Sequence, residues 1–481
     1  MTLTDRNRWF ALYVLCLGSL MIVLDVTIVN VALPSIRQGL GFSQTSLAWV
    51  VNAYMLTFGG FLLLGGRLGD LLGHRRLFVG GIALFTLASL GCGLSNSQGL
   101  LIGARAVQGL GGAVASAVAL SLMMGLFTAP GDRAKAMGIF GFVASGGGSL
   151  GVLLGGVITD VLDWHWIFLV NLPIGILVVL LTLRLIPGGR GAAQEGRLDV
   201  FGAVTVTGAL LLAVYAVVNG NQAGWLSTQT LGLLGAAAAL LGLFVAIEAH
   251  VAAPLVPLRL LRKRNIAFSN VVGVLWAAAM FALFFLSALY LQLVLGYSPL
   301  QVGLAFLPAN LIMGAFSIGL SAKLVMRFGI RPPLVTGLLI ATVALALFAR
   351  VPVHGHFIVD VLPSMILLGV GAGMAFNPVL LAAMSDVSPM ESGLASGIVN
   401  TAFMMGGALG LAVLASVAAA RTKALGGSGD LAALVGGYHA AFMIGAAFAL
   451  AAATIGGIFL RASVAGQHAA EDQAVAESIA A

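Results

Sequence analysis

Residues 9–33 read WFALYVLCLGSLMIVLDVTIVNVAL, a continuous apolar run that contains one carboxylate, Asp25. About 20 apolar residues suffice for a helix that crosses a bilayer, so the run predicts a membrane-spanning helix with an acidic group inside it. Arg6 and Arg8 precede the run as they would in a signal peptide, but the run is too long and lacks a small-residue cleavage site. We therefore expect an uncleaved first span.

The whole chain shares the composition of this first run. Of its 481 residues, 60% are hydrophobic and only 8% are charged, whereas soluble domains carry about a quarter charged residues. Almost no length remains for a soluble domain, which argues against a receptor or a membrane-tethered enzyme. The net charge of +7 lies in loops, so we expect no nucleic-acid partner. Cys16 and Cys92 fall in apolar runs and predict neither a disulfide framework nor a metal site.

Fourteen apolar runs are long enough to span a bilayer, in groups of six, two and six. We expect an all-α integral membrane protein of two pseudo-symmetric six-helix bundles with two inserted helices. The predicted units are an N-terminal bundle (1–186), an insert with its linkers (187–260), a C-terminal bundle (261–460) and a disordered cytoplasmic tail (461–481). The expected spans are 9–33, 47–66, 77–94, 100–122, 137–158, 167–186, 200–218, 231–247, 266–293, 302–322, 334–348, 361–383, 394–418 and 440–459.

The basic residues predict the orientation of these spans. If the N-terminus is cytoplasmic and the spans alternate, nearly all Lys and Arg residues fall on the cytoplasmic side, in agreement with the positive-inside rule. An even number of spans then places both termini in the cytoplasm. The outer side receives only Arg37, Arg350, Arg421 and Lys423.

The two groups of six spans resemble each other. The loop after the second span reads GRLGDLLGHRR (66–76), and the loop after the tenth reads AKLVMRFGIRP (322–332). When these loops are aligned on Gly73 and Gly329, the residues two positions later are both arginine, Arg75 and Arg331. Two similar six-helix halves imply a cavity at their interface that opens to one side at a time. That is the architecture of a transporter.

Asp25 is the only carboxylate well inside a predicted span. A charged Asp near the bilayer centre costs roughly 2.5–3.5 kcal/mol, so it is usually neutral or paired, and a functional role is the default hypothesis. A carboxyl group that takes a proton from one side and releases it to the other couples transport to a proton gradient. The alternative is a structural hydrogen-bond partner for a neighbouring helix.

Arg105, in LIGARAVQGLGG (101–112), is the second charge within a span. Its guanidinium stays protonated, so it needs an anionic or carbonyl partner. Helical spacing puts Gln108 and Gly109 on the same face as Arg105. Two roles remain open: Arg105 pairs with ionised Asp25 and takes part in coupling, or it donates to backbone carbonyls and acts only as a strut.

Two glycine-containing motifs suggest moving parts. Loop 66–76 combines an acid with glycines and a basic cluster, and such a network can latch two helices in one conformation and release them in the other. The alternative is a solvated basic loop. The fifth span carries glycines at intervals of four, a pattern of close helix packing that is either static or a sliding surface. The loop residues are Gly66, Asp70, Gly73, Arg75 and Arg76, and the span residues are Gly147, Gly151, Gly155 and Gly156.

Several residues are candidates for a substrate cavity. Span 266–293 places Trp276 and Phe284 on one face, which suits a large, apolar, partly aromatic compound or, alternatively, faces lipid. Polar side chains at membrane depth either bind substrate or pack helices together. These are Asn30, Asn52, Gln108 and Asn377.

Four motifs together resemble the major facilitator superfamily: LDVTIVNVALP (24–34), loop 66–76, RAVQGLGG (105–112) and the glycine-rich fifth span. The six-two-six layout is similar to that of the fourteen-helix drug:proton antiporters, the multidrug and antibiotic efflux branch. This resemblance implies that Asp25 is the proton-site carboxylate, Arg105 the essential fourth-helix arginine and loop 66–76 the conformational switch. The chain departs from the family at Val152, where the fifth-span motif normally has a proline.

We therefore expect a proton-coupled antiporter that exports drug-like or antibiotic compounds across the bacterial inner membrane by alternating access. The expected partners are a small hydrophobic or cationic substrate, protons and the lipid bilayer, and we expect a monomer. No cofactor is expected, because the nucleotide-binding pattern GxxxxGK[ST] is absent. The alternatives are proton-coupled uptake or export of one small metabolite, an integral-membrane enzyme, which would need clustered catalytic groups, and a passive channel, which has no use for a titratable carboxylate.

Overall fold

Helices make up nearly all of the structure, a computed structural model, and the residues it describes contain no β-strand. The predicted linker over 187–198 and the predicted tail over 461–481 lie outside those residues. The described residues are 5–43, 45–127, 130–186, 199–251, 254–385, 387 and 392–460.

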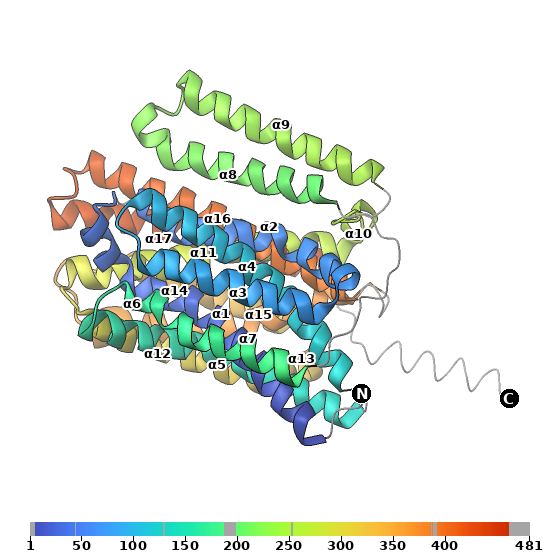
Figure 1. Ribbon diagram of the computed structural model, residues 1–481. Coiled ribbons are helices and arrows are strands. Elements are labelled where there is room, and N and C mark those ends of the chain that lie inside the picture. The colour runs from blue at the N-terminus through green and yellow to red at the C-terminus, as the bar shows by residue number, and fades with distance from the viewer. Residues whose placement is uncertain are drawn as a thin grey trace.

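The first half of the chain forms one group of packed helices (Figure 1). Long apolar segments fold as helices in a bilayer because a helix satisfies its own backbone hydrogen bonds. The elements are α1 (Asp5–Leu40), α2 (Trp49–Leu72), α3 (His74–Gly93), α4 (Gln98–Leu126), α5 (Pro130–Val161), α6 (Trp166–Leu169) and α7 (Asn171–Leu185).

The second half has a similar arrangement, in which short π-helical segments interrupt or extend three of the helices. Its α-helices are α10 (Leu258–Leu261), α11 (Arg264–Leu289), α12 (Pro299–Ala315), α13 (Ser321–Phe328), α14 (Arg331–Phe348), α15 (Leu362–Met384), α16 (Ser392–Ala424) and α17 (Leu431–Phe459). The π-helical segments are Tyr290–Val294, Phe316–Leu320 and Phe357–Val361.

The repeat that the sequence suggested has a structural counterpart at two turns. Gly73, between α2 and α3, has a φ of 94°, and Gly329, between α13 and α14, has a φ of 79°. Residues with a side chain rarely adopt these angles, so both tight turns depend on glycine. The alignment of loop 66–76 with loop 322–332 therefore pairs two turns of the same kind.

Among the described residues, twelve helices are long and apolar enough to cross a membrane, and two shorter apolar helices accompany them, Leu150–Val161 and Pro299–Ala315. The prediction of an all-α, multi-pass membrane fold is confirmed. The predicted count of fourteen spans is compatible with these helices. The apolar helix at Pro299–Ala315 is short because the π-helical segment Phe316–Leu320 separates it from α13.

The two halves meet most extensively along two helix pairs, α2 with α16 and α5 with α12, and α1 makes smaller contacts with α11 and α12. We call the end of the bundle that carries the start of α1, the turn between α2 and α3 and the end of α17 the termini end, and the other the opposite end (Figure 1). Near the opposite end, a Cβ atom added at Gly156 of α5 would lie 2.8 Å from the carbonyl oxygen of Pro299 in α12. The Gln292 side chain donates a 2.7 Å hydrogen bond to the Val31 carbonyl there, so the halves are in close contact at this end.

Helices α8 (Val200–Ala223) and α9 (Thr228–His250) form a hairpin on one side of the bundle, with α9 outermost (Figure 1). We call these two helices the inserted hairpin. Helix α8 packs against α2 from the first half and α16 from the second. The Asn221 side chain donates to the Ser416 carbonyl oxygen at 2.7 Å, and the Ser416 hydroxyl donates to the Val217 carbonyl oxygen at 3.0 Å. The inserted hairpin therefore touches both halves.

Candidate functional site

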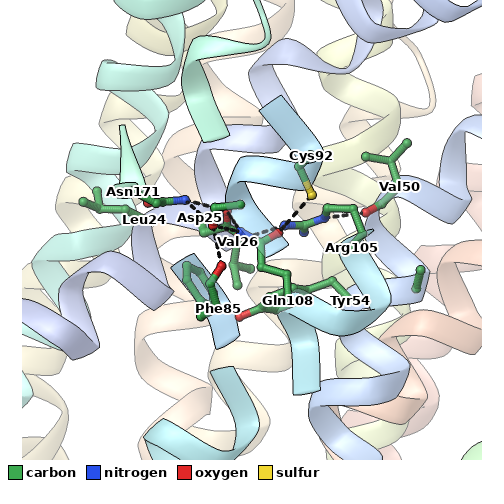
Figure 2. A network of polar contacts seen from close by, with 12 residues as sticks. Leu24, Asp25, Val26, Val50, Tyr54, Phe85, Cys92, Arg105, Gln108 and Asn171 are labelled. Carbon is green, nitrogen blue, oxygen red and sulfur yellow. Dashed lines mark hydrogen bonds and ion pairs between the residues drawn. The ribbon is translucent and has the colours of Figure 1, made fainter. Parts of the chain in front are cut away.

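Asp25 lies in the middle of the N-terminal half with no exposed surface. Its Oδ2 accepts a hydrogen bond from Arg105 of α4 at 2.5 Å, in an ion pair that is almost completely buried. Its Oδ1 accepts from the side-chain amides of Gln108 at 2.7 Å and Asn171 at 3.1 Å. Figure 2 shows these groups converging on Asp25 from α4 and α7. Three donors thus occupy both oxygens of the Asp25 side chain.

Arg105 makes both of the contacts that the sequence left open, one to Asp25 and one to a backbone carbonyl oxygen, while its part in coupling remains a prediction. Its guanidinium pairs with Asp25, and its Nε donates to the Val50 carbonyl oxygen at 3.0 Å (Figure 2). The same guanidinium donates to Gln108 Oε1 at 2.7 Å and lies 4.4 Å from the ring centre of Tyr54. A cation over an aromatic face gains further electrostatic stabilisation. Arg105 is thus held by α1 and α2 as well as by its own helix.

Several members of this network were not among the predicted site residues. Asn171, at the start of α7, binds Asp25 directly. Ser89 of α3 accepts from Gln108 at 2.8 Å, and the Cys92 thiol donates to Gln108 Oε1 at 3.6 Å. The only sequence signal was a polar side chain in an apolar run, which is weak for Ser89 because serine also bonds its own helix backbone. Ser89 does so here, donating to the Phe85 carbonyl at 2.8 Å.

Gln108 has a different place from the one predicted for it. As a polar side chain at membrane depth it was a candidate for the substrate cavity, whereas the structure buries it fully between Asp25, Arg105 and Ser89. Its amide links the acceptor and the donor of the ion pair, so Gln108 belongs to the Asp25–Arg105 network and not to a cavity lining.

The predicted switch loop lies at the termini end. The Arg75 guanidinium donates to the Leu183 carbonyl at 2.5 Å, which ties the start of α3 to the end of α7 within the first half. Arg76 is exposed, and a Cβ position on Gly66 has no heavy atom within 4 Å among the described residues outside its own stretch of helix. The side chain of Asp70 lies outside the described part of the chain. The latch hypothesis for this loop therefore remains a prediction.

The fifth-span glycines allow α5 to approach two different helices. Cβ atoms at Gly147, Gly151 and Gly155 would collide with α1, and at Gly151 the added atom would lie 2.9 Å from the Leu24 carbonyl oxygen. Gly156 instead faces α12, as described above. One stripe of glycines therefore joins α5 to the helix that carries Asp25, and the neighbouring position joins it to the other half.

A narrow, partly open cavity lies between α11, α15 and α16 of the second half. Its walls are mainly apolar and aromatic, with Trp276, Phe376 and Phe403 as the largest side chains and Asn400 as a polar group. Each of these residues lies in the part of its helix nearer the termini end. An apolar, aromatic lining with one amide offers mainly apolar contacts and a single polar anchor.

The predicted substrate residues are distributed over several places. Trp276 lines the cavity, and its indole nitrogen has no hydrogen-bond partner among the described residues. Phe284 packs edge-on against Phe306 of α12. Asn377 is half-buried, while Asn30 is buried and donates to its own helix at 3.4 Å. Asn52 is fully buried, and within the described residues neither of its amide atoms has a partner.

A family model described as Major Facilitator Superfamily matches residues 15–411. The chain belongs to this superfamily. It is therefore a multi-pass membrane transporter and not an enzyme, as the arrangement of helices and the resemblance predicted.

Curated relatives match along most of their length. The chain is 40% identical over 422 residues to the puromycin resistance protein pur8 of Streptomyces alboniger, covering 87% of this chain and 84% of the relative. It is 39% identical over 448 residues to the cephamycin export protein CmcT of Amycolatopsis lactamdurans, covering 92% and 91%. A lincomycin resistance protein of Streptomyces lincolnensis is 38% identical over 416 residues, covering 86% and 85%. The predicted resemblance to the antibiotic-efflux members of the superfamily is confirmed.

Solved structures agree on the fold. A bacterial homologue of the human lysosomal transporter Spinster, in an inward-facing and unoccupied conformation, superposes with a TM-score of 0.68 at 16% identity and covers 95% of this chain and 97% of its own. The xylose transporter XylE of E. coli, in an inward-open conformation, gives a TM-score of 0.64 at 16% identity, with 95% and 97% covered. At these identities the likeness concerns the fold alone.

Proposed function

We propose that this transporter is a proton-coupled antiporter that exports drug-like compounds across the bacterial inner membrane. The observation that carries the proposal is the fully buried Asp25–Arg105 pair within the membrane-spanning half. A titratable carboxylate is costly at this depth and marks an ion or proton pathway by default. The names of the relatives, which are resistance and export proteins for antibiotics, support drug efflux as the task.

Protonation of Asp25 is the proposed coupling step. A proton on this carboxyl group removes the charge that Arg105 faces, while Arg105 keeps the Val50 carbonyl and Gln108 as partners. The attraction between α1 and α4 then weakens. Helix α1 packs closely on α5 through Gly151 and Gly155, and α5 contacts α12 of the other half through Gly156. A shift of α1 is thus transmitted to the contact between the halves, which is what alternating access requires.

The proton gradient supplies enough free energy for such an exchange. One elementary charge moving inward across 100 mV releases about 2.3 kcal/mol. For a neutral substrate exchanged for one proton, this corresponds to a concentration ratio of roughly fifty for each 100 mV. Such an antiporter needs no nucleotide or other cofactor.

The cavity between α11, α15 and α16 is the proposed substrate site. Its aromatic walls and the amide of Asn400 suit a small hydrophobic or cationic molecule, because a cation is attracted to aromatic faces. With both termini in the cytoplasm, as the basic loops favour, the termini end is cytoplasmic. Substrate would then enter the cavity from the cytoplasm or the inner leaflet and leave on the opposite side. We propose that one chain performs this cycle alone.

The test is drug susceptibility and dye efflux in an efflux-deficient bacterial host that expresses the wild type or Asp25→Asn at matched levels. The panel contains puromycin, lincomycin, a cephamycin and ethidium. We expect the wild type to protect against at least one compound and Asp25→Asn to protect at least tenfold less, since its amide cannot carry a proton across. Equal protection by both proteins would show that Asp25 is structural, and sensitisation by the wild type would favour uptake.

A further inference from the structure

The inserted hairpin contains a second buried pair of acidic groups, far from Asp25 in the sequence. Asp199, at the start of α8, is 4% exposed, and Glu248, near the end of α9, is 3% exposed. They approach each other over Gly202, where an added Cβ atom would touch Oδ2 of Asp199 and would lie 2.9 Å from Oε1 of Glu248. Neither residue has a role in the coupling step proposed above.

Each carboxyl group uses one oxygen for a backbone hydrogen bond. Asp199 Oδ1 accepts from the Gly202 amide at 2.7 Å, which caps α8. Glu248 Oε2 accepts from the Val256 amide at 3.0 Å, which fixes the chain that runs from α9 to α10. The remaining oxygens, Asp199 Oδ2 and Glu248 Oε1, are buried and receive no hydrogen bond from any other described group.

Two facing carboxyl oxygens can form a hydrogen bond only if one of them carries a proton. Both oxygens are among the three heavy atoms nearest to one point, the Cβ position on Gly202. Two ionised carboxylates in this position would repel each other without solvent to screen them, so a pair of this kind retains one proton between its members. Among the described residues, no group of three or more His, Cys, Asp or Glu side chains forms a metal site. A proton satisfies both oxygens without any third side chain.

We infer that Asp199 and Glu248 together form a proton-binding site that fastens the inserted hairpin to the connector over residues 254–261. The proton joins the two carboxyl groups, and Glu248 in turn holds the connector through the Val256 amide. The connector contains α10 and leads into α11 of the second half. Loss of the proton places two like charges side by side and loosens this attachment.

The surroundings of the pair are apolar on the side of the first half. Leu64 of α2, Ala203 of α8 and Leu255 of the connector form a small buried cluster beside it. His250 on α9 is exposed, and its ring nitrogen contacts the Ala246 carbonyl. On the connector side, Arg259 is exposed and has a partner of its own.

Beyond Leu64, the sequence of α2 contains one basic and one acidic residue. The side chains of Arg67 and Asp70, beyond Leu64 on that helix, lie outside the described part of the chain. Among the described residues, the titratable and charged side chains considered at this site are Asp199, Glu248, His250 and Arg259. The last two are exposed.

Hydrogen exchange at the connector tests the inference directly. The full-length protein in lipid nanodiscs is measured by mass spectrometry from about pH 6 to about pH 9, after correction for the intrinsic exchange rate. In the wild type, we expect the protection of peptides covering 254–261 to fall by about tenfold or more as the pH rises, because the shared proton is lost. Peptides around Ala432, whose amide is capped by the single carboxylate of Asp430, are the internal control and should stay protected.

Two conservative variants imitate the protonated pair. Glu248→Gln can still accept from Val256 and can donate its amide to Asp199, and Asp199→Asn can still cap α8 and donate to Glu248. Both should keep the connector protected across the whole pH range, whereas Glu248→Ala should leave it unprotected throughout. Asp25→Asn should behave like the wild type, which separates this site from the proposed coupling site.

Three results would overturn the inference. The first is connector protection in the wild type that does not change with pH, and the second is loss of protection in Glu248→Gln and Asp199→Asn at the same pH as in the wild type. The third is recovery of protection at high pH when Na⁺ or Ca²⁺ is added alone, which would make the pair a cation site.

Discussion

Replacing Arg105 by methionine tests whether the buried ion pair has the energetics that the geometry implies. Arg105→Met removes the hydrogen bonds to Asp25, Gln108 and the Val50 carbonyl oxygen while preserving an apolar stem of similar length. The carboxylate of Asp25 has no exposed surface through which water could replace the lost charge. Breaking a buried pair by removing one partner costs about 3–5 kcal/mol. We expect the free energy of unfolding to fall by this amount and the unfolding temperature to fall by several degrees.

The same reasoning predicts a rescue. In Arg105→Met combined with Asp25→Asn, no buried charge remains, and the new amide can donate to Gln108 Oε1, which Arg105 no longer occupies. We expect the double variant to recover most of the lost stability, with a coupling free energy of about 2–3 kcal/mol. Arg184→Met is the matched control: it removes an arginine that is exposed at the end of α7 and should change stability by less than about 0.5 kcal/mol.

The protein carries its own reporter for this assay. Its two cysteines, Cys16 and Cys92, are both free and buried, so a thiol-reactive fluorescent dye reports their exposure on unfolding of the detergent-solubilised protein. A loss below about 1 kcal/mol for Arg105→Met would refute the argument from burial. So would a double variant that is no more stable than the single one.

Three further predictions concern the moving parts and the cavity. Gly156→Ala places a methyl group against the Pro299 carbonyl oxygen and should separate α5 from α12 near the opposite end. Crosslinking between cysteines introduced into these two helices should therefore decrease. Unchanged crosslinking would contradict the view that Gly156 permits this contact. Trp276→Ala enlarges the cavity and should change the order of protection across the drug panel without lowering expression, and an unchanged order would separate the cavity from substrate binding. Arg75→Ala removes the hydrogen bond to the Leu183 carbonyl oxygen and should lower the free energy of unfolding by about 1 kcal/mol. Arg75→Lys should restore part of this loss. Equal stability of the two variants would show that this hydrogen bond does not stabilise the fold.

Much of the fold was predictable because a bilayer leaves few choices for the backbone. Apolar runs of sufficient length located the helices, and the matching turns at Gly73 and Gly329 identified the two halves as a repeat. The run that ends at Ala322 was harder, because the π-helical segment Phe316–Leu320 divides it, and periodicity in an apolar sequence does not signal such a segment.

The candidate site was predictable only in part, and the reason is geometric. Asp25 and Arg105 are costly charges in an apolar sequence, so they stand out, but their pairing depends on how α1 and α4 cross. Asn171 contacts Asp25 from a helix that begins 146 positions later in the chain, and nothing in its local sequence points to that contact. The Asp199–Glu248 pair is equally hidden, because each residue alone resembles an ordinary polar group at a helix end.

Proton-driven transport in liposomes tests the central claim most directly. Purified wild type and Asp25→Asn are reconstituted, a pH gradient is imposed, and the uptake of a drug that the wild type exports is followed together with proton movement. We predict that the wild type accumulates the drug against its gradient while protons leave in exchange, and that Asp25→Asn exchanges drug for drug but does not respond to the pH gradient. Accumulation by Asp25→Asn at the rate of the wild type would contradict the account.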